Sequence, residues 1–128
     1  MDNLTLVIPA KYEKESLPSV LKELKKFNLN ITIVLEESDI DTIKSISDFN
    51  CKILFQENKG YGDALIQGIK SVKTDYFCIF NADGSFHPNE LEQMLKLAKN
   101  RNYDLVFGSR YEKNATSEDD TVITYVGN

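Results

Sequence analysis

Five short apolar runs divide the chain at intervals of roughly twenty-five residues. Each run is followed by a polar residue, a glycine or a proline, and the runs are LTLVI (4–8), ITIVL (31–35), KILFQ (52–56), YFCIF (76–80) and YDLVF (103–107). Short continuous apolar runs bounded by turn-forming residues are typical of strands that are buried on both faces. The pattern therefore predicts five buried strands.

Apolar residues recur at helical spacing between these runs, which predicts four helices. The predicted helices cover residues 16–27, 40–46, 61–72 and 88–98, and the second has the weakest pattern. In the first we expect Ser16 to be the cap and Pro18 to lie in the first turn. In the third we expect one face to be formed by Tyr61, Leu65, Ile69 and Val72.

The alternation of strands and helices predicts the fold class. It indicates an α/β protein with a mainly parallel sheet and helices on both faces. Right-handed crossovers in such a sheet bring the carboxyl ends of the strands to a common edge. We therefore expect the chemistry of the protein at that edge, where open α/β sheets bind their ligands.

The last seventeen residues do not continue the alternation of strands and helices. Residues 112–120 are polar and acidic, as in a surface loop, and residues 121–128 begin a new apolar segment that is either a strand or a helix. Because this segment begins without a partner, we expect the chain to be the first part of a longer, truncated protein. An apolar patch left by the missing part could support a homodimer.

Composition places the chain among compact globular proteins. It has 128 residues, of which 41% are hydrophobic and 27% are charged, enough for one domain with an ordinary core. No apolar run is long enough to span a membrane and the first residues do not resemble a signal peptide, so a cytoplasmic location is expected. Cys51 and Cys78 lie in apolar runs and are expected to be reduced core thiols.

The formal net charge of −5 narrows the class of ligand. Nucleic-acid binding requires a surplus of Lys and Arg along one face, so no nucleic-acid partner is expected. A small phosphorylated ligand remains compatible with an acidic protein. It requires local compensation by a cation, a nest of backbone amides or a placed Arg.

Carboxylates follow the first and second predicted strands. Glu13 lies in the first loop, and Glu36 and Glu37 directly follow the second strand. An ionised carboxylate only accepts hydrogen bonds, as the hydroxyls of a ribose or the amide of a base would require. An ordinary solvated loop or the start of a helix explains Glu36 and Glu37 equally well.

Glycines mark the end of the third predicted strand. Gly60 and Gly62 precede a predicted helix, where they permit turns with positive φ and a close approach of the backbone to a ligand. Their spacing matches neither a Walker loop nor a G-x-G-x-x-G fingerprint, and a tight turn explains them without a ligand. Gly68, inside the helix, suggests close packing against the sheet or a loop.

The fourth and fifth strand ends carry candidate ligands for a metal and a phosphate. Asn81 and Asp83 are two residues apart, and their oxygens suit Mg²⁺ or Mn²⁺ bound together with a diphosphate. A simple turn is the alternative, because Asn, Asp and Gly are common turn residues. Arg110 could pair with a phosphate through its fork of donors, or could lie exposed in a loop.

Four motifs in order resemble those of family 2 glycosyltransferases, which have the GT-A fold. VIPAKYEKESLP resembles the opening VIPAYNEEESL of that family, and NKGYGDALIQGI resembles its N-x-G-x-G-x-A-x-x-x-G element. NADGSFHP resembles the D-x-D segment DADGQHDP, and VFGSRY resembles a GSR strand end. Each lies at a predicted strand end, and together they cover most of the chain. By pattern, the dolichyl- or polyprenyl-phosphate sugar synthases are similar.

The resemblance implies a Rossmann-like site for a nucleotide-diphosphate sugar, with residues 1–128 as the N-terminal portion of a GT-A domain. It places Pro9 and Glu13 beside the base and ribose, with Glu37, and also Glu36, in place of the family's acidic pair. Gly60 would approach the donor. Asp83, with Asn81, would bind the Mg²⁺ or Mn²⁺ that bridges the diphosphate, and Arg110 would approach the phosphates.

The same resemblance implies transfer of the sugar to an acceptor, which is left open between a polyprenyl phosphate and a glycan. The acceptor-binding part and the carboxylate base of the family lie beyond the segment that matches Gly127 and Asn128. No catalytic base is therefore assigned, and any membrane association would come from that missing region.

Several residues depart from the family pattern. Asn81 replaces the first Asp of D-x-D, Tyr12 replaces the usual Asn, and Ser85 stands where many relatives have Gln. Loss of one charge at Asn81 would weaken metal binding. A catalytically inactive nucleotide-binding or interaction module is therefore the main alternative. A signalling receiver domain also suits the length, but the third strand ends without the phosphoacceptor Asp that such a domain needs.

Overall fold

The computed structural model describes residue 1 and residues 3–85, 87–101, 105–108 and 121–125, the last two ranges as backbone strands. The elements follow one another as strand and helix as far as the fifth strand. In chain order they are β1 (Leu4–Pro9), α1 (Ser16–Leu24), β2 (Asn30–Leu35), α2 (Ile40–Ser45), β3 (Lys52–Phe55), α3 (Tyr61–Lys70), β4 (Tyr76–Ile79), the 3₁₀ turn η1 (Pro88–Glu90), α4 (Leu91–Asn100), β5 (Leu105–Gly108) and β6 (Thr121–Tyr125).

The strands form one sheet in the order β3-β2-β1-β4-β6-β5. β1 pairs in parallel with β2 and with β4, and β2 pairs in parallel with β3. β6 is antiparallel to both β4 and β5 and separates them. The apolar segment that begins at Thr121, which the sequence left open between strand and helix, is therefore a strand. β5 runs in the same direction as β4, but the two strands are not neighbours.

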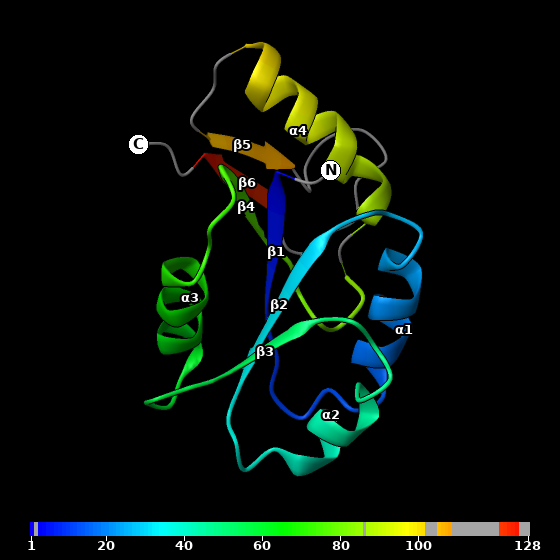
Figure 1. Ribbon diagram of the computed structural model, residues 1–128, viewed down its shortest axis with the longest axis vertical. Helices are drawn as coiled ribbons and strands as arrows, with labels where there is room; N and C mark the ends of the chain where they lie inside the picture. Colours follow the sequence, from blue (N-terminus) through cyan, green and yellow to red (C-terminus); the bar gives the residue numbers. More distant parts are fainter. Residues whose placement is uncertain (2, 86, 102–104, 109–120, 126–128) are drawn as a thin grey trace.

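Helices cover both faces of the sheet, as predicted. α3 lies alone on one side of the sheet, and α1, α2 and α4 lie on the other (Figure 1). The alternation of side chains along β1 explains this division. Leu4, Leu6 and Ile8 belong to the larger core cluster with α1 and α4, whereas Val7 belongs to a smaller cluster with Ala64 of α3.

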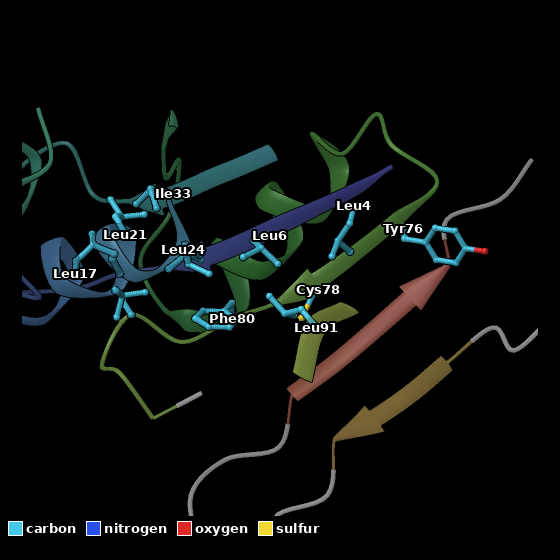
Figure 2. Packing of buried hydrophobic residues seen from close by; sticks show 14 of the residues in the cluster. Leu4, Leu6, Leu17, Leu21, Leu24, Ile33, Tyr76, Cys78, Phe80 and Leu91 are labelled. Atoms are coloured by element: carbon cyan, nitrogen blue, oxygen red, sulfur yellow. The ribbon is translucent and has the colours of Figure 1, made fainter. Parts of the chain in front are cut away.

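The larger core is formed by close contact between α1, α4 and the centre of the sheet. Leu17, Leu21 and Leu24 of α1 lie near Leu6 of β1 and Phe80, which follows β4 (Figure 2). All five side chains are fully or almost fully buried. The core thus holds β1 and β4 side by side, so that the loops after these strands lie next to each other.

Two details at α1 differ from the prediction. Ser16 is the first residue of the helix and not its cap, because the cap position is Glu15 and no side chain there makes a capping hydrogen bond. The Ser16 hydroxyl instead donates to Oε2 of Glu13 at 2.5 Å. Phe27 lies beyond the end of the helix at Leu24, although Pro18 does lie in the first turn as expected.

Gly68 is buried where α3 packs on the sheet. A Cβ atom at this position would overlap Cγ1 of Val7 and would lie 3.1 Å from Cγ2 of Val34. Because the glycine lets the helix axis approach β1 and β2, the expected close packing of this residue is confirmed. The packing fixes the N-terminus of α3 beside the carboxyl ends of these strands.

Both cysteines are free thiols. Cys78 is buried in β4, and Cys51, just before β3, is half-buried against the larger core cluster. Burial raises the pKa of the Cys51 thiol above its ordinary value of 9.0, because the apolar surroundings disfavour the thiolate. The prediction of reduced core thiols is consistent with these positions.

Candidate functional site

A cleft of about 390 Å³ opens at the carboxyl ends of β1, β2, β3 and β4. This is the edge at which the sequence predicted the chemistry of the protein. The residues that line the cleft come from the end of β1, from the loops after these four strands and from the first turns of α3: Pro9, Ala10, Lys11, Glu13, Glu36, Gln56, Gly60, Tyr61, Ala64, Asn81, Ala82 and Asp83.

Six of the eight candidate residues line this cleft, namely Pro9, Glu13, Glu36, Gly60, Asn81 and Asp83. Glu37 does not line it: this residue is exposed in the turn after β2, whereas the half-buried Glu36 directly follows the strand. The expectation that Glu37 would be the principal acid of the pair stays a prediction, although of the two residues only Glu36 lines the cleft. Arg110 lies outside the described residues.

Three polar residues of the cleft were not predicted from the sequence, namely Lys11, Gln56 and Tyr61. Tyr61 was expected on the apolar face of its helix, but it is the first residue of α3 and 58% of its surface is exposed. Its position directly after Gly60 was the available signal, because a residue at the start of a helix points past the strand end. Gln56 similarly stands at the end of a predicted strand.

The loop between β3 and α3 is held by its own side chains. Nε2 of Gln56 donates to the carbonyl oxygens of Asn58 at 3.1 Å and Gly60 at 3.0 Å. Gly60 has φ of +105°, which glycine adopts without strain. Gly62 lies inside α3 and does not have positive φ, so only the first of the two glycines makes the expected turn.

The loop after β4 is a turn that also lines the cleft. The backbone N–H of Ser85 donates to Oδ1 of Asp83 at 2.9 Å, and Gly84 has φ of +84°. The two interpretations of this segment are thus compatible: the chain turns at Ala82 and Asp83, and Asn81 and Asp83 both line the cleft on either side of the buried Ala82. Nearby, Oγ of Ser85 is buried and has no hydrogen-bond partner within the described ranges.

The donor set at the end of β4 fits a metal ion that is shared with a substrate. Among the residues that the structure describes, no group of three or more His, Cys, Asp or Glu side chains could hold a metal ion. Asp83 and Asn81 supply one carboxylate and one amide. Mg²⁺ is commonly held by one or two carboxylates together with substrate phosphates and water, so this small donor set suits such an ion.

The electrostatics of the cleft also bear on its ligand. Its lining includes three carboxylates, from Glu13, Glu36 and Asp83, and one ammonium group, from Lys11. Nζ of Lys11 lies 5.7 Å from the centre of the Tyr12 ring. A diphosphate in this cleft would face a surplus of negative charge, which a divalent cation would offset.

Comparison with known sequences identifies one family. The sequence model of "Glycosyl transferase family 2" matches residues 5–124. The chain is 29% identical over 132 residues to an uncharacterized protein of Methanocaldococcus jannaschii, an alignment that covers 99% of this chain and 54% of that protein. It is 33% identical over 116 residues to an uncharacterized glycosyltransferase of Rickettsia prowazekii, covering 85% and 36% of the two chains. The chain therefore spans about half or less of these relatives.

Comparison with solved structures identifies the fold. Glucosyl-3-phosphoglycerate synthase from Mycobacterium tuberculosis in complex with UDP has a TM-score of 0.78 at 13% identity, covering 97% of this chain and 57% of that one. The same synthase with Mn²⁺, UDP and glucosyl-3-phosphoglycerate has a TM-score of 0.70 at 17% identity, covering 81% and 42%. A cytidylyltransferase from Leptospira borgpetersenii has a TM-score of 0.72 at 15% identity, covering 98% and 61%. The prediction of a Rossmann-like GT-A fold is confirmed.

In the described part of the chain, none of the helices combines the length and the apolar character needed to cross a bilayer.

Proposed function

Because this chain belongs to glycosyl transferase family 2, we propose that it binds a nucleotide-diphosphate sugar in the cleft at the carboxyl ends of β1–β4. In this proposal, residues 1–128 are the donor-binding N-terminal portion of a GT-A glycosyltransferase domain. The observation that carries the proposal is the convergence of Glu13, Glu36, Asn81 and Asp83 from three separate loops on one cleft.

The nucleoside end of the donor lies beside β1 and β2. Pro9 lines the cleft at the end of β1, and the carboxylates of Glu13 and Glu36 accept hydrogen bonds from ribose hydroxyls or from a base N–H. Glu37, which follows Glu36 and is exposed in the turn after β2, stays a secondary candidate. Gly60, which lacks a side chain, leaves room for the donor beside α3.

The diphosphate lies beside the loop after β4, where Asp83 and Asn81 hold Mg²⁺ or Mn²⁺. When bound, the ion supplies charge stabilisation for the departing nucleoside diphosphate. The chain itself orients the donor through Glu13 and Glu36 and keeps Asp83 in place through the hydrogen bond from Ser85. The presence of Mn²⁺ and UDP in the related Mycobacterium tuberculosis synthase supports this choice of ion and ligand.

Transfer of the sugar requires an acceptor, which we take to be a polyprenyl phosphate or a glycan. Arg110 is proposed to approach the phosphates, because it follows β5 in the sequence and β5 runs in the same direction as β4. No general base is assigned to this chain. The acceptor site and the base are proposed to belong to the part of the relatives that the chain does not span.

An inactive nucleotide-binding module is the second candidate function. It is favoured by Asn81, which removes one carboxylate from the D-x-D position. A receiver domain, the remaining alternative from the sequence, is wrong because the chain belongs to glycosyl transferase family 2.

Isothermal titration calorimetry tests the proposal. The chain is titrated with UDP-glucose, GDP-mannose, UDP and GDP, each with and without Mn²⁺. We expect one nucleotide class to bind, with an affinity at least about ten-fold higher in the presence of Mn²⁺, because the cleft otherwise opposes the diphosphate charge. Absence of binding to all four ligands with Mn²⁺ would contradict the proposal, and metal-independent binding would favour the inactive module.

A further inference from the structure

A buried carboxylate lies behind the cleft, outside its lining. Asp39, immediately before α2, is only 6% exposed and is the one charged residue that is buried in the part of the chain described with side chains. Burial of a carboxylate is unfavourable unless hydrogen bonds satisfy it. The partners of Asp39 therefore indicate what the residue does.

Asp39 and Thr42 bind two consecutive amides of the loop between β1 and α1. The N–H of Tyr12 donates to Oδ2 of Asp39 at 2.8 Å, and the N–H of Glu13 donates to Oγ1 of Thr42 at 3.1 Å. Thr42 is fully buried in α2. We call Asp39 and Thr42 together the α2 latch. The latch joins segments that are 27 and 29 residues apart in the chain.

The latch holds a backbone conformation that is unfavourable on its own. Tyr12 has φ of +56°, and it is the one residue other than glycine with positive φ in the described ranges. A side chain with a Cβ atom disfavours this left-handed region. Tyr12 is 75% exposed, so burial of this residue does not compensate for the strain. The hydrogen bond from the Tyr12 N–H to Asp39 ties the backbone to the buried carboxylate in this conformation.

The same residues connect the two acidic sides of the cleft. The backbone N–H of Asp39 donates to the carbonyl oxygen of Glu36 at 3.0 Å, and the side chain of Asp39 holds the residue before Glu13. Glu13 is fixed further by the hydroxyl of Ser16. The positions of Glu13 and Glu36 relative to each other therefore depend on Asp39.

We propose that Asp39 and Thr42 are positioning residues that hold Glu13 and Glu36 in the arrangement that binds the nucleoside part of the donor. This inference rests on the proposed function, since it concerns the same cleft. The latch residues themselves do not line the cleft. Asp39 acts through the backbone of Tyr12, and Thr42 acts through the backbone N–H of Glu13. Both hydrogen bonds align Glu13 before a nucleotide binds.

The first test removes one hydrogen bond without changing the size of the side chain. Thr42→Val loses the acceptor for the N–H of Glu13, Thr42→Ser retains it, and Thr32→Val makes the same exchange at a buried position of β2 away from the cleft. Hydrogen exchange of the Glu13 amide is followed by NMR, and the affinity for UDP or GDP with Mn²⁺ is measured by calorimetry. For Thr42→Val we expect faster exchange and an affinity about three- to ten-fold weaker. In Thr42→Ser and Thr32→Val, the exchange rate of the Glu13 amide and the nucleotide affinity should both stay close to those of the unmodified chain.

The second test separates positioning from general destabilisation. Asp39→Ala removes the partner of the Tyr12 amide and should weaken nucleotide binding by about three- to ten-fold. Adding Tyr12→Gly to that variant should restore part of the affinity, because glycine adopts positive φ without strain. A loss caused only by a damaged core would not be restored by this change in an exposed loop residue.

The outcomes distinguish the two proposals. If the unmodified chain binds neither UDP nor GDP with Mn²⁺, the proposed function and the positioning role are both overturned. If the unmodified chain binds but Thr42→Val binds equally well, with unchanged exchange at Glu13, the positioning role alone is overturned. Should Thr42→Val fail to fold, failure of Tyr12→Gly to restore binding in the Asp39→Ala variant overturns the positioning role.

Discussion

At the end of β4, single residues both stabilise a turn and line the cleft. Asp83 accepts a hydrogen bond from Ser85 through Oδ1, which stabilises the turn, and its side chain also lines the cleft. Asn81 lies in the same cleft but has no charge at neutral pH. The two positions therefore differ in what they can contribute to a cation, and they can be tested separately.

Removing the charge of Asp83 should weaken metal-dependent binding. For Asp83→Asn we expect the Mn²⁺-dependent affinity for the nucleotide to fall by about ten-fold or more, because the remaining ligands of the chain are uncharged amides. Asp48→Asn makes the same change at an exposed position away from the cleft and should have no effect. Calorimetry with and without Mn²⁺ measures both, and equal affinities for the two variants would contradict a metal role of Asp83.

Restoring a carboxylate at Asn81 should have the opposite effect. Asn81→Asp adds a second charged oxygen ligand beside Asp83, and metal affinity in oxygen-ligand sites rises with the number of charged ligands. We expect Mn²⁺ to bind about five-fold more tightly or better, as measured by calorimetry. An unchanged Mn²⁺ affinity would favour the inactive module.

The packing of α3 on the sheet controls the geometry of the cleft at the scale of elements. Gly60, Tyr61 and Ala64 line the cleft from the first turns of this helix, while Gly68 holds its later part against β1 and β2. A displacement of α3 from the sheet would therefore change the cleft as well as the core. α3 contains two glycines, Gly62 and Gly68, of which only Gly68 packs against the sheet. The same substitution at the two positions therefore tests the effect of this packing.

Gly68→Ala should destabilise the fold although alanine favours helices. The added Cβ would overlap Cγ1 of Val7, a β-branched residue that is fully buried and has little rotamer freedom. We expect a loss of about 1–3 kcal/mol in the free energy of unfolding, measured by chemical denaturation.

Gly62→Ala is the control for this change. Nothing lies within 4 Å of a Cβ built at Gly62, which also lies in α3. Here the helix propensity of alanine should act without a clash and stabilise the chain by about 0.5 kcal/mol. Equal effects of the two substitutions would show that close packing at Gly68 does not limit the approach of α3.

The sheet divides the whole molecule into two unequal cores. The larger core lies between the sheet and α1 and α4, and the smaller lies beneath α3. Cys51 packs at the edge of the larger core from a position before β3. Its ionisation is therefore linked to the stability of the entire fold.

Stability should fall with rising pH because of Cys51. Burial raises the pKa of this thiol in the folded chain above 9.0, so the unfolded chain releases its proton first as the pH rises. The stabilising contribution is complete below the unfolded pKa and is lost as the pH rises through the folded pKa. We expect the difference in unfolding free energy between the unmodified chain and Cys51→Ala to decrease between about pH 8 and about pH 10. A constant difference over that range would contradict the assigned burial effect.

Much of the fold could be predicted because its patterns are local. Apolar runs identified β1 to β5, helical spacing identified α1 to α4, and the residues after each strand pointed to the correct edge of the sheet. Six of eight candidate residues line one cleft for this reason: parallel strands bring their carboxyl ends together whatever the details of packing. The order of the four motifs was enough to indicate the family.

The tertiary structure alone decided which distant segments are neighbours. No local pattern shows that β6 lies between β4 and β5, or that Glu36 and not Glu37 lines the cleft. The α2 latch was equally hidden, because Asp39 and Thr42 acquire their role only where the chain folds back on the loop after β1. Hydrophobic periodicity reports which face of an element is buried, whereas pairing and hydrogen bonds across the fold depend on which surfaces meet, and that is set by the packing of all the elements together.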